Sequence, residues 1–499
     1  SAAGWAHVAD GSAMTVLGID LGTQSVKVAA VEATHDGRDA TVVASASRPY
    51  PVDSPHPGWA QSDPQAWLAA VSDAAAEVLD RIGDTPVALG LSGQMHGVVL
   101  TDDTGAALRP AILWADTRSA EQARRIRADL GANTLARLGS APFPGFAGVT
   151  LAWLAEHEAD LLARARWALQ PKDWLRLQLT GAVATDPSDA SGTLLYDLVA
   201  GAWSEEAMVA CRVRSDLLAP VQASGALAGM VRADPHLAGL PVATGGADAA
   251  CGVHGLGLTV GRGALALGTG AQLSSVIATA DPDDTLRTHT FATVGRVGEA
   301  FYRLGAVQSG GLALERVLAW LGADVAEAQR ALAAGIRPGD PLFFPFVAGE
   351  RSPYLDPDLR ASWLGLSLST TREAMLRSVL EGMAYTVAAA YAAIVESGAA
   401  PASPLTVLGG GSRDPAYVAL LATALGISLR PAAVADATVI GAARLGADVV
   451  GESFPALAVA APGAGAHGIV EPAHNAIVSE RQQRWVADAP SSQRGQSSE

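Results

Sequence analysis

One acidic residue stands between a glycine turn and a run of small residues, in the segment Thr244-Gly-Gly-Ala-Asp-Ala-Ala-Cys-Gly252. The glycines predict a turn and the residues after them favour a helix, so Asp248 is expected near a helix N-terminus. There the free N–H groups and the helix dipole favour an ionised carboxylate. A carboxylate held in this way and open to a substrate hydroxyl can act as a general base. The alternative is a structural role, in which the aspartate caps the helix.

A second acidic residue, Asp20, lies at the end of an apolar run that begins at Val16, and a second apolar run follows after Gly22, Thr23 and Gln24. Two such runs joined by a short turn predict a β-hairpin. The N–H and hydroxyl groups of the turn can hold a phosphate, which makes these three turn residues candidate ATP-binding residues. Asp20, at the strand end, is placed to meet a divalent cation such as Mg²⁺.

The same strand, turn and strand pattern recurs about half a chain later, with Gly268, Thr269 and Gly270 in the turn. Two phosphate-binding hairpins at corresponding places predict two duplicated domains that face each other across a nucleotide. The second hairpin therefore supplies a second set of candidate ATP-binding residues.

A third glycine turn, Gly409-Gly-Gly411, follows the strand-like segment that starts at Leu405 and precedes a helix signal at Asp414 and Pro415. Because glycines have no side chain, a ligand can lie close against their backbone. We expect Gly410 and Gly411 to contact the adenosine of ATP.

In their order these motifs resemble the carbohydrate kinases of the FGGY family, members of the actin and Hsp70 ATPase superfamily. The resemblance extends from Thr15 to about Trp485, and within the family it is strongest to the xylulokinase branch. The segments that carry it are Ser92-Gly-Gln-Met-His-Gly97, Pro110-Ala-Ile-Leu-Trp-Ala-Asp-Thr-Arg118, Pro171-Lys-Asp-Trp-Leu-Arg176, Ser188-Asp-Ala-Ser-Gly-Thr193 and Gly349-Glu-Arg-Ser-Pro353. It implies an α/β fold of two duplicated RNase H-like domains of the actin and Hsp70 type, with a cleft between them.

The resemblance also implies a reaction, the ATP-dependent phosphorylation of D-xylulose to D-xylulose 5-phosphate in pentose catabolism. Asp248 would accept the proton of the attacking sugar hydroxyl, and Asp20 would be the second catalytic carboxylate and the Mg²⁺ ligand. The residues implied to contact the sugar with Asp248 are Gln94, Met95, His96 and Trp114. An ordinary aspartate, with a pKa of about 3.9, is ionised at neutral pH, so we expect Asp248 to need no large pKa shift.

Two departures from the family pattern leave the identity of the sugar substrate undecided. Ala249 stands where an asparagine commonly follows the catalytic aspartate, and Ala115 stands where an asparagine commonly follows the tryptophan at Trp114. An FGGY kinase for another pentulose or a polyol is therefore the first alternative, and a non-catalytic actin-like ATPase is the second. Without the surrounding Ser92–Gly97 motif, the interpretation of Met95 and His96 would be structural: a core methionine and a core histidine whose hydrogen bonds are satisfied.

The amino-acid composition limits the kinds of molecule that the protein is expected to bind. The chain of 499 residues has a formal net charge of −16 and no basic cluster, which argues against nucleic acid. No apolar run of about 18 residues is present to span a membrane. The two cysteines, Cys211 and Cys251, are too few for a disulfide framework and are typical of a cytoplasmic protein. We expect ATP and a small sugar as ligands and, as a protein partner, at most a second copy in a homodimer.

The length predicts more than one domain. We expect a remnant over residues 1–13 ahead of a native start at Met14, an N-terminal domain over 14–239, a C-terminal domain over 240–487 and a disordered tail over 488–499. This boundary places Asp248 at the cleft. The N-terminal domain should contain a helix after Asp63-Pro64 and a buried strand over 86–91 that leads into the Gln94 segment, and a further helix is expected over 371–395.

Overall fold

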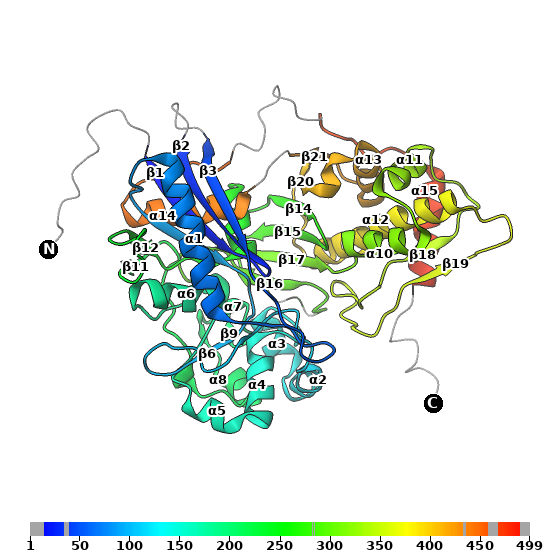
Figure 1. Ribbon diagram of the computed structural model, residues 1–499. Coiled ribbons are helices and arrows are strands. Elements are labelled where there is room, and N and C mark those ends of the chain that lie inside the picture. Colours follow the sequence, from blue (N-terminus) through cyan, green and yellow to red (C-terminus); the bar gives the residue numbers. More distant parts are fainter. Residues whose placement is uncertain are drawn as a thin grey trace.

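Two mixed β-sheets that share a hairpin-plus-parallel-strand core form the framework of the molecule (Figure 1). The computed structural model describes residues 14–33, 39–281, 283, 285–432, 436–457 and 468–489. The first sheet has the order β11-β12-β5-β1-β2-β3, with β13 also paired to β5, and the second has the order β16-β17-β15-β14-β20-β21. In each sheet an antiparallel hairpin, β1-β2 or β14-β15, lies beside a parallel partner, β5 or β20. The predicted duplicated α/β architecture is confirmed.

The strands of the first sheet are β1 (Thr15–Leu21), β2 (Ser25–Ala33), β3 (Ala40–Pro49), β5 (Leu89–Gly93), β11 (Leu227–Met230), β12 (Pro241–Ala243) and β13 (Gly246–Ala247). Those of the second are β14 (Gly263–Leu267), β15 (Ala271–Ile277), β16 (His289–Ala292), β17 (Phe301–Val307), β20 (Leu405–Gly409) and β21 (Leu429–Pro431). Short two-stranded pairs are β4 (Gln61–Ser62) with β7 (Ala111–Ile112), β6 (Val99–Thr101) with β8 (Trp167–Leu169), β9 (Tyr196–Asp197) with β10 (Ala202–Trp203), and β18 (Leu342–Phe344) with β19 (Ser362–Leu364).

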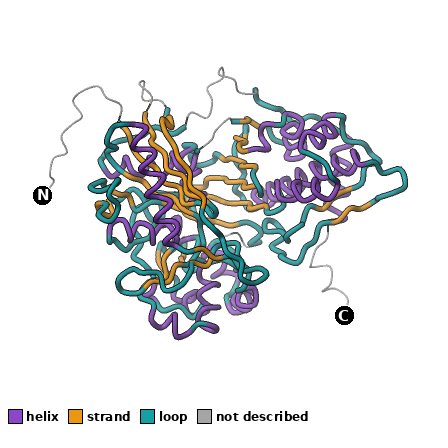
Figure 2. Tube along the Cα trace, in the orientation of Figure 1, coloured by secondary structure: helices purple, strands orange, loops and turns teal. Residues whose placement is uncertain are grey.

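Helices cover the sheets and form a lobe beneath the first sheet, as Figure 2 shows. The helices that precede the second sheet in sequence are α1 (Pro64–Ile82), α2 (Ala120–Asp129), α3 (Ala132–Leu138), α4 (Ala147–His157), α5 (Ala159–Arg164), α6 (Pro171–Thr180), α7 (Pro187–Ser191), α8 (Glu205–Ala210) and α9 (Asp248–Gly255). The later helices are α10 (Gly311–Leu321), α11 (Val325–Ala333), α12 (Arg372–Glu396), α13 (Pro415–Leu425), α14 (Ala437–Val449) and α15 (Ala476–Asp488).

The predicted elements form close to their expected bounds. Helix α1 begins with Pro64 at its first turn, and the Asp63 carboxylate accepts a hydrogen bond from the Gln65 N–H at 3.0 Å. Its apolar stripe, which includes Trp67, Val71 and Val78, is buried against β2 and β3. The strand predicted over 86–91 is β5, which runs slightly later, and the helix predicted over 371–395 is α12.

Helix α12 is long and apolar enough to cross a membrane by composition alone, but 78% of its most apolar window is buried inside the protein. It packs against α10, α11, α13 and β18 and is the central core helix of the second domain.

The predicted domain boundary at 239/240 is too early. Strands β12 and β13 lie beyond it, yet both pair in parallel with β5 of the first sheet, Val242 beside Leu89 and Gly246 beside Ser92. Asp248 therefore belongs to the N-terminal domain. The glycines of this segment let the chain lie close to β5, because a Cβ on Gly245 would lie 2.6 Å from the Leu91 carbonyl oxygen.

The chain also returns to the first domain near its end. Helix α14, drawn in orange among the blue strands of Figure 1, packs on β1, β5 and α9. Glycines make this contact possible, because a Cβ on Gly441 would lie 1.9 Å from the Cys251 carbonyl oxygen and one on Gly90 would lie 1.7 Å from that of Ala442. The helix that follows Asp248 is thus held by a segment almost 200 residues later in the chain.

The chain ends differ from expectation in one respect. Asp488 is the last residue of α15 and Ala489 is buried, so the first two residues of the predicted disordered tail are ordered. The predicted remnant at residues 1–13 and residues 490–499 of the predicted tail lie outside the described residues.

The α9–α14 contact gives a stability prediction. Gly441→Ala forces a methyl group against the α9 backbone and should lower the free energy of unfolding by about 1–3 kcal/mol. Gly252→Ala is the matched control, because its Cβ would meet only the Thr438 hydroxyl oxygen at 3.6 Å and alanine is the better helix former. Denaturant unfolding of both variants measures the difference. Equal stability in the two would show that α9 and α14 do not pack closely.

Candidate active site

The ends of three neighbouring strands bring the two predicted catalytic carboxylates to one edge of the first sheet. In the register of β1, β5 and β13, Asp20 lies beside Ser92, and Ser92 lies beside Gly246. Asp248 directly follows β13 and is the first residue of α9. The Ser92 hydroxyl donates a hydrogen bond to Asp20 Oδ1 at 3.3 Å. Side chains at the carboxyl ends of parallel strands converge in this way in α/β proteins.

Burial raises the pKa of both carboxyl groups. Burial raises the pKa of Asp20 to about 6, although the Ser92 hydrogen bond and the Lys27 charge act in the opposite direction. Burial raises the pKa of Asp248 to about 7, and the like charge of Asp20 raises it further. The expectation of an ordinary pKa for Asp248 is therefore wrong, because the sequence does not show how deeply the pair is buried. A pKa near the working pH suits a general base.

Asp248 is only weakly engaged in capping its own helix. The N-cap position is occupied by Ala247, and Asp248 Oδ1 accepts one hydrogen bond, from the Ala249 N–H at 2.7 Å. Its other oxygen, Oδ2, has no hydrogen-bond partner among the described residues. The carboxylate thus keeps an acceptor free for a ligand.

Buried charges fix the segment that carries Asp248. Lys172 Nζ lies 2.6–3.0 Å from carboxylate oxygens of Asp173, Asp186 and Asp189, all of them buried. Ser188 Oγ donates to Asp186 at 2.5 Å and accepts from the Ala247 N–H at 2.9 Å. The residue before Asp248 is in this way tied to a buried ion cluster.

The first hairpin turn offers fewer phosphate donors than expected. The Gly22 N–H donates to the Ser25 carbonyl oxygen at 3.1 Å, so it is used inside the turn. The Gly22 carbonyl oxygen accepts from Gln94 Nε2 at 3.1 Å and from the Tyr50 hydroxyl. The N–H groups of Thr23 and Gln24 have no partner among the described residues. Gln94, a candidate sugar contact, therefore supports the phosphate turn.

A pocket of about 370 Å³ in the second domain is lined by four of the predicted nucleotide-binding glycines, Gly268, Gly270, Gly410 and Gly411. A Cβ on Gly410 would meet no atom within 4 Å, and one on Gly268 would meet only the Gly270 carbonyl oxygen at 3.9 Å. The protein itself therefore does not require glycine at these two positions. Thr269 does not line the pocket, and its carbonyl oxygen accepts from the Leu312 N–H at 2.9 Å.

Sequence reasoning missed most of this pocket. Its other walls come from α10, α11, α12 and α13 and from the turn before α10, and they include Leu380, Met383, Val387, Gly310 and Gly311. The Gly310-Gly311 pair between a strand and a helix is the same signal that identified Gly410 and Gly411. The α12 residues gave no signal, because a buried helix face looks the same whether or not a ligand covers it.

A second pocket, of about 490 Å³, is lined by His96 and Trp114 from the first domain and by Gln308 and Arg351 from the second. Met95 is buried beside it, with its sulfur 3.9 Å from the Tyr302 hydroxyl. Neither Asp20 nor Asp248 lines this pocket. The pocket is linked to the phosphate turn through Trp114, whose Nε1–H donates to the Thr23 hydroxyl at 2.8 Å.

His96 is held as a neutral acceptor in the wall of this second pocket. Its Nδ1–H donates to the Gly192 carbonyl oxygen at 2.6 Å, which leaves Nε2 unprotonated. Burial lowers the pKa of His96 to about 3, and the nearby Arg351 charge lowers it as well. Its backbone is left-handed, with φ of 70°, a strained conformation for a residue with a side chain. Ala115 lines the same pocket and adds no polar group.

The carboxylate pair fits a magnesium ion held mainly by nucleotide phosphates. Among the described residues there is no cluster of three or more His, Cys, Asp or Glu side chains that could form a complete metal cage. Mg²⁺ is usually held by one or two carboxylates together with phosphates and water. Asp20, with its raised pKa and a second carboxylate nearby, matches the first part of that set.

Comparison with known proteins agrees with this arrangement. Models of the FGGY family of carbohydrate kinases match residues 15–255 with the N-terminal domain and residues 263–448 with the C-terminal domain. Xylulose kinase of Escherichia coli is 31% identical over 442 residues, which cover 86% of this chain and 89% of that protein. The crystal structure of a "xyloylose kinase" from Brucella ovis is 32% identical and superposes with a TM-score of 0.85 over 95% of this chain and 99% of that one.

A gluconate kinase structure from Lactobacillus acidophilus has a similar TM-score, 0.84, over 95% of this chain and 96% of that one, at only 19% identity, so it is similar in fold alone. The chain belongs to the FGGY family of carbohydrate kinases. It is accordingly an ATP-dependent carbohydrate kinase with the actin-like kinase fold.

The glycine-lined pocket gives a binding prediction. Gly410→Ala adds a methyl group that only a ligand would meet, so it should weaken ATP binding by roughly ten-fold while leaving the fold intact. Gly339→Ala is the control, because its Cβ also meets no atom and the residue does not line the pocket. Titration calorimetry with ATP measures both. Unchanged affinity in Gly410→Ala would place the nucleotide elsewhere.

Proposed function

We propose that the chain transfers the γ-phosphoryl group of ATP to O5 of D-xylulose, with Asp248 as the general base. The observation that carries the proposal is the position of Asp248 at the start of α9, with a pKa raised to about 7 and one carboxylate oxygen free. The Gln94-Met95-His96-Gly97 motif and the relatives named xylulose kinase support the choice of sugar.

In this mechanism the sugar occupies the pocket walled by His96 and Trp114, and the triphosphate runs from the glycine-lined pocket toward the two hairpin turns. The ionised Asp248 accepts the hydroxyl proton as the sugar oxygen attacks the γ-phosphorus and ADP leaves. His96 Nε2 accepts a hydrogen bond from a sugar hydroxyl and cannot compete as an acid, because its imidazole is neutral. Phosphoryl transfer depends mainly on such alignment and on charge neutralisation.

Mg²⁺, when bound, would neutralise phosphate charge next to Asp20. The chain's own contribution is to hold the two carboxylates and the free N–H groups of Thr23 and Gln24 around the transferred group. The proposed nucleotide pocket lies in the second domain, and the proposed sugar pocket is lined by residues of both domains. Approach of the two domains would therefore exclude water from the γ-phosphate.

Another pentulose is the second candidate, favoured by Ala115 and Ala249. Ala115 lines the sugar pocket and Ala249 directly follows the proposed base, so two positions next to the sugar have no polar side chain. We place the enzyme in the cytoplasm, because Cys211 and Cys251 are both buried and unpaired.

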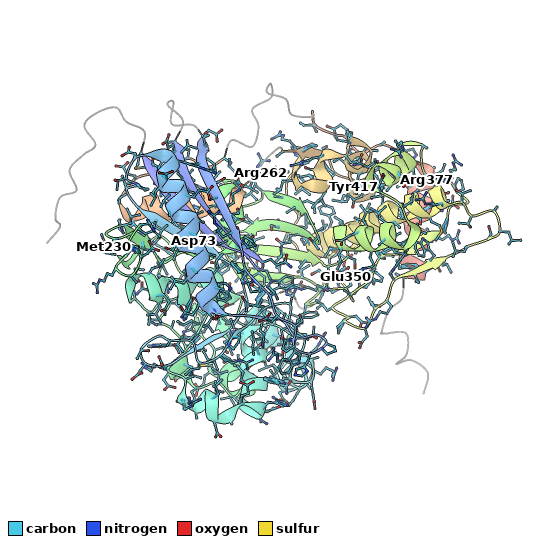
Figure 3. The ribbon with its side chains drawn as sticks, in the orientation of Figure 1. Asp73, Met230, Arg262, Glu350, Arg377 and Tyr417 are labelled. Atoms are coloured by element: carbon cyan, nitrogen blue, oxygen red, sulfur yellow. The ribbon has the colours of Figure 1, made fainter. Side chains whose placement is uncertain are left out.

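The central test is removal of the base. Asp248→Asn should keep its fold and its ATP affinity but lose two to four orders of magnitude in sugar phosphorylation, the range for loss of a general base. Asp73→Asn, the same change at an exposed site on α1 (Figure 3), is the control. A coupled ATP-consumption assay with D-xylulose, D-ribulose, L-ribulose, glycerol and gluconate measures both.

The possible outcomes of this assay test separately the role of Asp248, the choice of sugar and the kinase activity itself. Retention of more than about a tenth of the activity in Asp248→Asn excludes Asp248 as the base. Preference of the unmodified enzyme for a sugar other than D-xylulose overturns the substrate assignment alone. Absence of sugar-dependent turnover with all five compounds would favour the non-catalytic ATPase.

A further inference from the structure

The segment Gly349–Pro353 of the second domain is fixed by one buried carboxylate. Glu350 is 0% exposed and accepts hydrogen bonds from the N–H groups of Gln308 at 2.6 Å, Ser309 at 3.2 Å and Arg351 at 2.8 Å. Figure 3 labels Glu350 on the side of the second domain that faces the lobe beneath the first sheet. Three backbone donors satisfy the charge of Glu350, so it has little need of the neighbouring guanidinium.

The backbone around Glu350 has no freedom to move away. The Ser352 N–H donates to the Ala306 carbonyl oxygen of β17 at 2.9 Å. Gly349 is left-handed, with φ of 77°, and a Cβ there would lie 2.6 Å from the Pro357 carbonyl oxygen. The loop therefore holds Arg351 at a defined position against β17.

Arg351 lacks the partners that a partly buried guanidinium normally has. Its Nε is inaccessible to solvent and has no hydrogen-bond partner, and no carboxylate forms a salt bridge with it among the described residues. Burial lowers the pKa of Arg351 to about 10, so the group is charged at neutral pH. The Glu350 charge acts in the opposite direction, but the buried Nε donor still has no acceptor, and such a donor costs free energy unless a ligand supplies one.

The surroundings of Arg351 point to the sugar side of the cleft. It lines the same pocket as His96 and Trp114, and its guanidinium carbon lies 5.5 Å from the centre of the Phe143 ring. It does not line the glycine-rich nucleotide pocket. The acceptors that could reach it are therefore oxygens of the molecule in the pocket of His96.

We propose that Arg351 is a substrate-binding residue of the second domain, whose N–H groups donate to oxygens of the sugar from the side opposite His96 and Trp114. The proposal rests on the proposed function, in which this pocket holds the sugar. A guanidinium presents five donors in a fixed plane, which suits the hydroxyl and carbonyl oxygens of a ketose. Glu350 is the positioning residue, because it orients the backbone of Arg351 without using its side chain.

The proposed contact between Arg351 and the sugar would give the sugar a role in bringing the two domains together. His96 and Trp114 of the same pocket belong to the first domain, so a sugar bound to them and to Arg351 contacts both domains at once. A ligand that contacts both domains favours the conformation in which they are close together. Nucleotide alone makes no such link through Arg351, since that residue is absent from the nucleotide pocket.

Three variants test the proposal in the full-length enzyme. Arg351→Met keeps the apolar bulk and should raise the KM for the sugar by roughly ten- to a hundred-fold, the range for loss of charged hydrogen bonds, with little change in ATP affinity. Arg351→Lys, which keeps one cationic donor group, should recover part of that loss. Arg262→Met is the matched control, because Arg262 is exposed in the same domain, has no side-chain partner among the described residues and lines neither pocket.

Solution scattering provides a readout that a purely structural role would not give. Saturating sugar should reduce the radius of gyration of the unmodified enzyme and of Arg262→Met, but not of Arg351→Met. The sugar used is the one preferred in the five-compound assay, so a different natural sugar does not affect this test.

Four results would overturn the proposal. Equal sugar KM in Arg351→Met and Arg262→Met would overturn it while leaving the kinase function intact. A loss of ATP affinity without loss of sugar affinity would assign Arg351 to the phosphates instead. Sugar-induced compaction that persists in Arg351→Met would exclude the bridging contact. Failure of the unmodified enzyme to bind any of the five compounds would remove the proposed function and this proposal with it.

Discussion

The burial of two carboxylates at one edge of the first sheet is the constraint on which the rest of the site depends. Asp20 and Asp248 are brought together because β1 and β13 both flank β5 and end at the same edge of the sheet. Burial raises the pKa of Asp20 to about 6 and that of Asp248 to about 7, and the like charge of Asp20 contributes to the shift of Asp248. This pair costs stability in the free enzyme but becomes favourable once a cation and a substrate hydroxyl supply partners, as the proposed reaction requires.

The framework holds this unfavourable arrangement in place from several directions. Helix α14 packs on β1, β5 and α9 through close glycine contacts, and the ion cluster around Lys172 fixes the segment before Asp248 through Ser188. One of the two hairpins lies in each domain, while the glycine-lined pocket proposed for the nucleotide lies wholly in the second domain. In the proposed function, the ligand contacts are therefore divided between the two copies of the sheet.

Local pattern was sufficient for the hairpins, for α1 and for the position of Asp248 at a helix start, because turn residues and caps act within a few residues of themselves. Local pattern did not predict the features that depend on contacts between segments far apart in the chain. The boundary near residue 240 was wrong because β12 and β13 pair with β5, a strand far earlier in the chain, and local composition does not reveal such pairing. The pKa of Asp248, the α12 wall of the nucleotide pocket and the free guanidinium of Arg351 depend on tertiary contacts that no spacing reveals.

The measurement that tests the central claim most directly is titration of the two carboxyl groups in the ligand-free enzyme. Infrared difference spectra or carbon-13 NMR of labelled aspartate, assigned by loss of the signal in Asp248→Asn, should show Asp248 ionising near pH 7. In Asp20→Asn the like charge is gone, so the pKa of Asp248 should fall. An Asp248 carboxyl group that ionises near the ordinary value of about 4, or one that Asp20→Asn leaves unmoved, would contradict the account.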